Sequence, residues 1–195
     1  KPDGTTIKWV ISQGSNNSLE FINSGSTDFA STSGISALVA RTNGFPIKMV
    51  YMLNTNEASM LMVTKDAPFK TIKDLKGKKI GFSVGGFEEA LLSGMLEKYN
   101  IKMTDVDLIN INFSLSPSLI AKKVDAVIGA FRNFELNQMD IVNHPGKAFY
   151  PEEHGVPSYE ELIYIANVKN RNNPIFDKFF KAIQKATLTI INDPE

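Results

Sequence analysis

The stretch Lys78–Tyr99, which reads KKIGFSVGGFEEALLSGMLEKY, decides the fold class of this chain. Residues 79–83 are apolar enough to predict a buried strand, and residues 84–86 supply a glycine turn. A helix is expected from about Phe87, because the apolar residues that follow recur on one helical face: Leu91, Leu92, Met95 and Leu96. Asn100 stands where the C-terminal cap of that helix is expected.

The predicted strand, turn and helix make residues 84–86 the first candidate site. In open α/β sheets, ligands bind at such turns because free backbone N–H groups point toward them. The alternative is an ordinary loop between a strand and a helix, and the turn by itself favours neither interpretation.

The composition narrows the possible classes of protein. A chain of 195 residues, 43% hydrophobic and with zero formal net charge, can bury the core of one large domain or two small lobes. The absence of a basic excess argues against nucleic acid as a partner. No apolar run reaches the roughly 18 residues that a membrane span needs. The chain has no cysteine, and its two histidines, His144 and His154, are better interpreted as solvated loop residues than as a zinc pair.

Strands and helices are expected to alternate along the chain, which predicts an α/β fold with a parallel or mixed sheet covered by helices. The first block contains strands at 7–11, 27–31, 47–53 and 57–63 and helices at 16–23 and 35–42. The second block contains a helical turn at 71–77, the stretch described above, strands at 107–112 and 124–130, and a helix at 116–123.

The last part of the chain is expected to be a loop at 143–158, a strand at 162–168 and a long helix that opens at Asn173-Pro174. That helix carries a wide apolar stripe, interpreted as core packing against a sheet: Ile175, Phe176, Phe179, Phe180, Ile183 and Ala186. A first sheet of three or four strands would leave much of this helix without a partner.

Several runs together resemble a known family. They are residues 31–34 (STSG), 74–81 (DLKGKKIG), 85–92 (GGFEEALL), 123–135 (KVDAVIGAFRNFE) and 148–157 (AFYPEEHGVP). They resemble the periplasmic substrate-binding proteins of ABC importers, in the superfamily of thiamine-pyrimidine synthases and sulfonate receptors. The most similar branch binds the pyrimidine precursor of thiamine, either hydroxymethyl-aminopyrimidine or its formylamino relative.

The resemblance implies a periplasmic-binding-protein type II-like fold of two lobes that close on a ligand about hinge strands. Lobe one is expected at 1–63 and 166–195, lobe two at 64–165, and the hinges near 60–65 and 163–168. The family normally has a signal peptide, an opening strand and helix, and a last helix that this sequence lacks, so the expectation is an incomplete chain. The resemblance also implies a monomer in the periplasm or lipid-anchored outside the cell membrane, an ABC permease as partner, no metal and no cofactor.

The residues expected to face the cleft come from four segments. The candidate ligand-binding residues are Ser33, Asn54, Asn56, Ser83, Gly85, Gly86, Phe87, Glu88, Phe131, Asn133 and Glu135. For residues 54–56 an Asx-type turn is an equally good interpretation.

The charges in these segments favour one kind of ligand. Glu88 and Glu89 occupy the first turn of the predicted helix, where a carboxylate would repel a bound anion; their alternative role is to stabilise the helix N-terminus by roughly 0.3–1 kcal/mol. Either role favours a neutral or cationic heteroaromatic ligand.

Glu135 is the best candidate for specificity, since a carboxylate accepts from an exocyclic amino group and a protonated ring nitrogen together. Phe131 and Phe134, or Phe87, could stack on the ring, each stack contributing about 1–3 kcal/mol by analogy with nucleic-acid bases. The alternative makes Glu135 a helix-start carboxylate paired with Arg132, with the phenylalanines in the core.

Three functions follow from the resemblance. The first is a non-catalytic receptor that delivers an aminopyrimidine to an importer. The second is a thiamine-pyrimidine synthase, whose fungal forms use a cysteine-rich iron-binding motif and an active-site histidine; the lack of cysteine disfavours it. The third is a nitrate-, taurine- or sulfonate-type receptor, which the glutamates at the turn disfavour.

Overall fold

The computed structural model of the protein describes residues 4–194. The chain forms two compact units, which divide between Leu53 and Asn54 and again between Glu161 and Leu162. Unit 1 contains both ends of the chain, and unit 2 is residues 54–161. The sequence placed these divisions at 63/64 and 165/166. They differ because the strand at Ser59–Thr64 pairs within the sheet of unit 2 and the strand at Leu162–Asn167 pairs within the sheet of unit 1.

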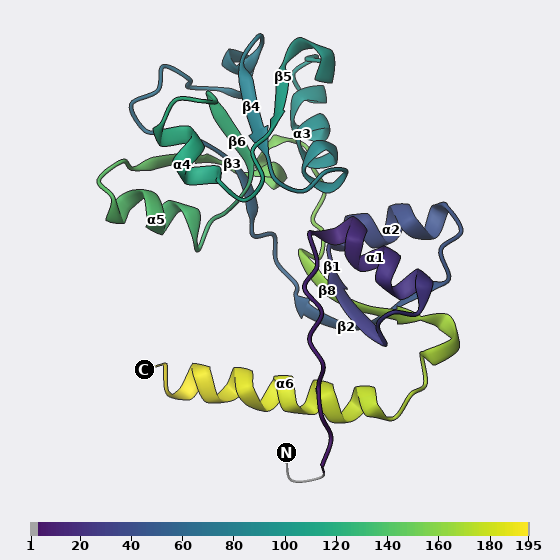
Figure 1. Cartoon of the computed structure of the whole chain (residues 1–195). Helices are drawn as coiled ribbons and strands as arrows, with labels where there is room; N and C mark the ends of the chain where they lie inside the picture. The colour runs from purple at the N-terminus through teal and green to yellow at the C-terminus, as the bar shows by residue number, and fades with distance from the viewer. Residues whose placement is uncertain (1–3, 195) are drawn as a thin grey trace. The chain divides into compact units, whose positions relative to one another are not determined.

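Unit 1 is built on a three-stranded sheet whose order is β1 (Phe29–Thr32), β8 (Leu162–Asn167) and β2 (Ile47–Asn54), with β1 and β8 antiparallel. Side chains alternate across β8. Ile163 and Ile165 face α1 (Ser15–Ser24) and α2 (Gly34–Thr42), while Tyr164 and Ala166 face α6 (Ile175–Asn192). Helices therefore cover both faces of this sheet (Figure 1).

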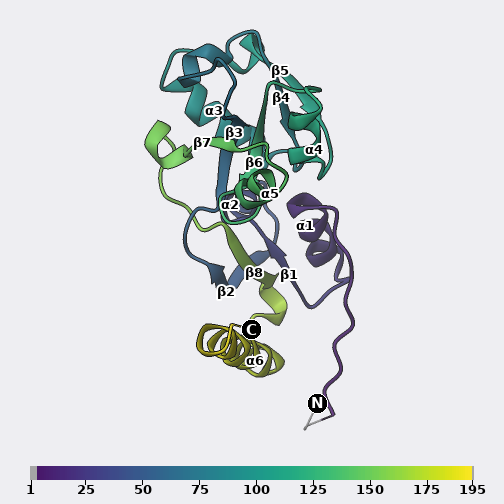
Figure 2. The same cartoon turned by 90° about the vertical axis from the view of Figure 1, so that its left-hand side faces the viewer.

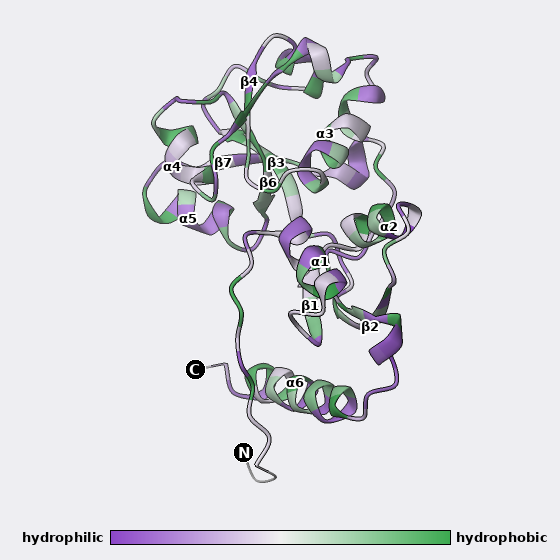
Figure 3. Ribbon diagram, turned by 45° about the vertical axis from the view of Figure 1, so that its right-hand side comes forward, coloured by the Kyte–Doolittle hydropathy of each residue, from purple (hydrophilic) through white to green (hydrophobic). Residues whose placement is uncertain are grey.

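Helix α6 packs by its phenylalanines, as its apolar stripe predicted. Phe176, Phe179 and Phe180 are buried against Phe29 of β1, and Tyr51 of β2 stacks on Phe180. The stripe loses contact toward the C-terminus, since Ala186 is exposed. Leu188, Ile190 and Ile191 are also exposed, and Figure 3 shows hydrophobic colour continuing along the helix. The prediction that part of this helix has no partner in its sheet is confirmed.

One predicted strand of unit 1 is wrong. Residues 7–11 have no regular structure, and Trp9 and Ile11 are 72% and 84% exposed. Their apolar, β-branched composition predicts a strand, but composition stabilises a strand only where a partner strand pairs with it. The sheet order β1-β8-β2 contains no place for this segment.

Unit 2 is built on a five-stranded mixed sheet. Its order is β5 (Asp107–Asn110), β4 (Lys79–Phe82), β6 (Ala126–Phe131), β3 (Ser59–Thr64) and β7 (Gly146–Phe149). Strand β4 is parallel to both β5 and β6, whereas β3 is antiparallel to β6 and β7. Of the two sheet types that the sequence allowed, parallel and mixed, this sheet is mixed.

Helices lie on both sides of this sheet. Met60, Met62, Val127 and Ala130 pack against α4 (Leu115–Ile120) and α5 (Glu135–Ile141). Helix α3 (Phe87–Glu97) lies on the other side, as Figures 1 and 2 show. Three single turns complete the unit: η1 (Ile72–Leu75), η2 (Met103–Asp105) and η3 (Pro151–His154); a fourth, η4 (Val168–Asn170), follows β8 in unit 1.

Two elements of unit 2 were not among the predicted strands and helices. Residues 143–158 were expected to be a loop, but Gly146–Phe149 forms β7, an edge strand beside β3. The prolines at 145 and 151 flank this strand without interrupting it, and only one of its sides needs hydrogen-bond donors. Helix α5 follows β6 directly, so the carboxylate at position 135 is a helix-start residue. Elsewhere, Asn100 has the left-handed conformation (φ 57°) that suits the end of α3.

Within the described part of the chain, every helix is too short or too polar to serve as a membrane span.

Candidate functional site

The candidate site lies at one edge of the unit 2 sheet. Strands β4 and β6 are parallel neighbours, so their carboxyl ends meet at the same edge. Strand β3 runs the opposite way, and its first residue, Ser59, pairs with Phe131 at the end of β6. The edge therefore gathers the turn after β4, the turn after β6 and the chain entering β3. We call these segments, together with residues 159–161 that bond to the chain entering β3, the carboxyl-end site.

Glu88 holds the turn after β4. Its Oε2 accepts the backbone N–H of Ser83 and its Oε1 accepts the Ser83 hydroxyl, each at 2.6 Å. The side chain is only 3% exposed. Burial raises the pKa of Glu88 from 4.5 to about 7, against the bonds from Ser83 that lower it. Glu88 thus fastens the start of α3 to the end of β4.

A β-bulge in β6 makes room for this carboxyl group. The register between β3 and β6 shifts between Met60 and Leu61, which pair with Ala130 and Ile128, so Gly129 is the extra residue. Gly129 has φ +90°, and a Cβ there would overlap the carboxyl group of Glu88. Gly129 is therefore required twice, for its backbone conformation and for the space above it.

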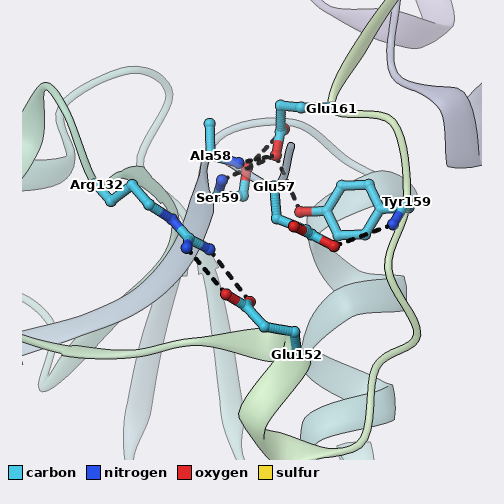
Figure 4. Close-up of polar contacts among 7 residues, drawn as sticks. All are labelled: Glu57, Ala58, Ser59, Arg132, Glu152, Tyr159 and Glu161. Atoms are coloured by element: carbon cyan, nitrogen blue, oxygen red, sulfur yellow. Dashed lines mark hydrogen bonds and ion pairs between the residues drawn. The ribbon is translucent and has the colours of Figure 1, made fainter. Parts of the chain in front are cut away.

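A second buried carboxylate, Glu161, ties the chain entering β3 to the chain leaving unit 2 (Figure 4). It accepts the N–H groups of Ala58 and Ser59 and the Ser59 hydroxyl, each at 2.8 Å, and the Tyr159 hydroxyl at 3.0 Å. It is 1% exposed. Four donors match the acceptor capacity of an ionised carboxylate.

Tyr159 connects this network to α3. Its ring meets Phe87 edge to face, with centroids 5.9 Å apart, and its N–H donates to Glu57 at 3.3 Å. Burial, together with the neighbouring carboxylate of Glu161, raises the pKa of Tyr159 above its ordinary value of 10. Phe87, predicted to contact ligand, is 5% exposed and packs here in the core.

Arg132 is held by Glu152. Its two terminal nitrogens donate to the two carboxylate oxygens at 2.9 and 3.2 Å, and its guanidinium lies 4.5 Å from the centroid of the Tyr150 ring. The alternative that paired Arg132 with Glu135 is therefore wrong. The positive charge at this edge is already neutralised by a bidentate partner.

Glu135 occupies the first position of α5. Its Oε2 accepts the N–H of Phe131 at 2.6 Å, and Oε1 has no partner from another residue in the described chain. The side chain is half-buried, and burial raises the pKa of Glu135 while the Phe131 N–H lowers it. Phe131 is half-buried, whereas Asn133 and Phe134 are exposed. A carboxylate with one available oxygen and two accessible rings lies at this end of β6.

The other predicted residues of the turn serve the helix start. Gly86 is the N-cap of α3, and its N–H donates to Glu89 at 2.8 Å. Gly85, half-buried, precedes it. The helix-start role considered for both glutamates thus belongs to Glu89, and Glu88 serves the strand instead.

The remaining predicted residues have local roles. Asn54 accepts the N–H of Asn56 at 3.2 Å, which is the Asx turn that the sequence left open. Ser33, in unit 1, is the N-cap of α2: its hydroxyl accepts the Ser36 N–H at 3.1 Å and donates to the Ser36 hydroxyl at 2.9 Å. Ser33 is 2% exposed and lies outside the carboxyl-end site.

Sequence reasoning missed four residues of this site: Glu57, Ser59, Tyr159 and Glu161. No local signal marks Glu161, since three of its four donors, in Ala58 and Ser59, lie 102 or 103 positions away in the chain. His154, interpreted as a solvated loop residue, is instead half-buried in η3, where its Nδ1 shares a hydrogen bond of 2.8 Å with the Tyr99 hydroxyl. Among residues 4–194, no three His, Asp or Glu side chains are grouped so as to hold a metal ion.

Comparison with known proteins identifies the family of this chain. The family described as "NMT1/THI5 like" matches residues 3–195. The chain belongs to the NMT1/THI5-like family.

Relatives in this family have several functions by name. A Haemophilus influenzae protein named for thiamine biosynthesis is 47% identical over 144 residues, 74% of this chain and 46% of that protein. The formylaminopyrimidine-binding protein of Halalkalibacterium halodurans is 23% identical over 195 residues, 99% of this chain and 59% of that protein. A Saccharomyces cerevisiae 4-amino-5-hydroxymethyl-2-methylpyrimidine phosphate synthase is 27% identical, covering 90% of this chain and 55% of the enzyme. The chain spans about half the length of these relatives.

Solved structures agree on the fold. The alkanesulfonate-binding protein SsuA of Xanthomonas axonopodis, bound to MOPS, matches with a TM-score of 0.75 at 21% identity, over 95% of this chain and 64% of that one. The periplasmic sulphonate-binding SsuA of Escherichia coli matches with a TM-score of 0.68 at 21% identity, over 90% and 60%. The α/β fold of the type II periplasmic-binding-protein kind, implied by the resemblance, is confirmed.

Proposed function

We propose that this NMT1/THI5-like chain is the solute-binding component of an ABC importer and binds an aminopyrimidine precursor of thiamine. The observation that carries the proposal is Glu135, a half-buried carboxylate with one oxygen committed to the Phe131 N–H and the other open. Such an oxygen can accept from the exocyclic amino group of a pyrimidine, and a protonated ring nitrogen beside it strengthens the pair. Phe131, which is half-buried, and Phe134, which is exposed, belong to the same turn and can offer ring faces to a ligand.

The charge balance supports an amino heteroaromatic over an anion. The segments of the carboxyl-end site, residues 57–59, 83–88, 129–135 and 159–161, contain five glutamates and no lysine. Their single arginine, Arg132, is engaged by Glu152. A sulfonate or nitrate needs donors that are not already neutralised. The sulfonate-binding relatives therefore define the competing ligands for the test.

The names of the relatives support pyrimidine chemistry, since one is named for formylaminopyrimidine binding and one for hydroxymethylpyrimidine phosphate synthesis, while a third is named for thiamine biosynthesis. We propose the receptor and not the synthase, with the protein located in the periplasm or anchored outside the cell membrane. Full-length protein incubated with pyridoxal phosphate, iron and oxygen is expected to yield no pyrimidine product. Turnover that depends on the protein would refute this part of the proposal.

Titration calorimetry tests the ligand. Full-length protein, stripped by unfolding and refolding, is titrated with hydroxymethyl-aminopyrimidine, its formylamino relative, taurine and nitrate. Binding of a pyrimidine without binding of the anions is expected; the reverse would establish the sulfonate-type alternative. Mass spectrometry of the material released on denaturation identifies the ligand that the protein carries from the cell.

Glu135→Gln tests the residue. The amide still accepts at its oxygen, but its NH₂ group meets a donor on the ligand, so affinity should fall by roughly 1.5–3 kcal/mol, or about ten- to a hundredfold. Asp140→Asn is the matched control, because Asp140 is an exposed acid on the same helix and its loss removes the same charge. Equal affinity in Glu135→Gln and parent would show that Glu135 only begins α5.

A further inference from the structure

The contact between Glu88 and Ser83 can exist in two hydrogen-bond patterns. Glu88 Oε1 faces the Ser83 hydroxyl and Oε2 faces the Ser83 N–H, both at 2.6 Å. A hydroxyl has one hydrogen to donate. While Glu88 is ionised, that hydrogen is directed to Glu88, and Ser83 offers only lone pairs to any other group.

Protonation of Glu88 reverses one of these bonds. A proton taken from solvent onto Oε1 gives a neutral carboxyl group, which donates its O–H to the Ser83 oxygen, while Oε2 still accepts the Ser83 N–H. The hydrogen of the Ser83 hydroxyl is then free to donate elsewhere. One proton is gained and no covalent bond other than the new O–H is formed.

We propose that Glu88 is a positioning residue whose protonation state decides whether the Ser83 hydroxyl donates to the ligand or only accepts from it. The inference rests on the proposed function for the identity of the ligand. Glu88 is 3% exposed, so it acts through Ser83, which is half-buried at the end of β4 in the carboxyl-end site. The bulge at Gly129 holds the carboxyl group in place, because the space that a Cβ would fill is the space that the carboxyl group occupies.

The groups around Glu88 keep its protonation equilibrium within the physiological range of pH. Burial raises the pKa of Glu88 to about 7, and the charge of Glu161 acts in the same direction. Glu161 accepts four hydrogen bonds of its own, from Ala58, Ser59 and Tyr159. On α3 itself, Glu89 is directed to the N–H of Gly86. At the end of β6, the charge of Arg132 is matched by Glu152.

The remaining elements that pack against α3 are η1, η2 and η3, and their charged groups bond to partners other than Glu88. In η3, His154 bonds to Tyr99 at the far end of the helix. In η1, Asp74 accepts the N–H groups of Lys70 and Thr71. In η2, Asp105 accepts the N–H of Lys102 and lies 3.8 Å from the ammonium of Lys76. Glu161 is thus the neighbouring charge that acts on Glu88.

The proton switch can be observed without ligand. In full-length protein labelled with ¹⁵N, the chemical shift of the Ser83 amide is followed from pH 5.5 to 8.5. A titration with a midpoint near 7 is expected in the parent. It should be absent in Glu88→Gln, since the glutamine amide accepts from the Ser83 N–H and donates to the Ser83 hydroxyl at every pH. Glu89→Gln is the matched control and should titrate as the parent does.

The effect on binding is measured by calorimetry with hydroxymethyl-aminopyrimidine at pH 6 and pH 8. The titration of the probe itself is common to all variants, so the ratio of the two affinities is compared between them. We expect the ratio in the parent to exceed that in Glu88→Gln by about two- to tenfold, favouring pH 6. When Ser83→Ala is added to the parent and to Glu88→Gln, the two ratios should become equal, whereas a simple charge effect of Glu88 on the ligand would keep them apart.

The outcomes separate the two proposals. Equal ratios in parent and Glu88→Gln, or a difference that persists with Ser83→Ala, would overturn the role of Ser83. A Ser83 amide that does not titrate would overturn the switch whether or not the probe binds. If the probe binds at neither pH, the proposed ligand is refuted, and the amide titration alone decides whether Glu88 reverses its bond to Ser83.

Discussion

Two strand-to-helix turns in this molecule are built from different chemistry. Between β1 and α2 in unit 1, the Ser33 hydroxyl caps the helix, and the Ser33 N–H donates to the Ser15 hydroxyl at 3.1 Å. Between β4 and α3 in unit 2, the carboxyl group of Glu88 reaches back to Ser83 from within the helix. The first turn is held by neutral groups and the second by a buried acid. A turn between a strand and a helix can therefore be insensitive to pH in one unit and dependent on pH in the other.

The largest expected effect comes from filling the space beside Glu88. Gly129→Ala places a Cβ over the carboxyl group at a residue with φ +90°, which combines backbone strain with overpacking. We expect unit 2 to lose roughly 3 kcal/mol or more of stability. Hydrogen exchange of full-length protein, read by mass spectrometry, should show faster exchange in peptides covering 79–97 and unchanged exchange in peptides covering 29–42.

Two variants sharpen this result. Gly85→Ala is the control, because its Cβ would meet only Phe82, at 4.0 Å, and no strained φ is involved. In the double variant Gly129→Ala with Glu88→Ala, the overlap disappears and only the backbone strain remains. The loss of stability in the double variant should therefore be smaller than the sum of the losses in the two single variants. Additive losses would mean that Glu88 does not occupy the space above Gly129.

The next effect is a dependence of stability on pH. The pKa of Glu88 is about 7 in the folded protein, against 4.5 for an ordinary glutamate. The folded state therefore holds a proton that the unfolded state has lost, and stability from this group is full below pH 4.5 and is lost as pH rises to about 7. A shift of this size corresponds to about 3 kcal/mol. At pH 4.5, Glu88→Gln and the parent should unfold at the same temperature. At pH 8, Glu88→Gln should unfold at a higher temperature than the parent.

Thermal unfolding of full-length parent and variant across this pH range measures the difference. Glu89→Gln is the control and should leave the slope in place, since Glu89 reaches only the N–H of Gly86. If the difference in unfolding temperature between the parent and Glu88→Gln does not change with pH, Glu88 titrates like a surface acid.

The sequence predicted both turns because their signals are local. Glycines interrupt an apolar run and a helical period follows, at residues 34–42 as at 86–97. It could not distinguish Glu88 from Glu89, since both stand in the first helical turn. What separates them is Gly129, far along the chain, where the bulge in β6 accepts one carboxyl group and not the other.

The same limit explains the other differences. Residues 7–11 have strand composition but no partner strand, and β7 is a strand despite flanking prolines because β3 offers it an edge. The Glu161 network depends on contacts across 102 positions and has no sequence pattern. Pairing between distant segments decides each of these cases, and a single sequence carries no direct signal of such pairing.

The smallest expected effect lies in the turn of unit 1. Ser33→Ala removes the cap of α2 and leaves the Ser36 N–H without its acceptor, which should cost about 1 kcal/mol. Because the bond joins neutral groups, the loss should be the same at pH 5 and pH 8. Exchange in peptides covering 29–42 should rise while that in peptides covering 79–97 stays unchanged. Ser24→Ala, at an exposed serine ending α1, is the control and should have little effect. A loss in Ser33→Ala that grows with pH would mean that a titrating group also supports this turn, and the contrast between the two turns would then be wrong.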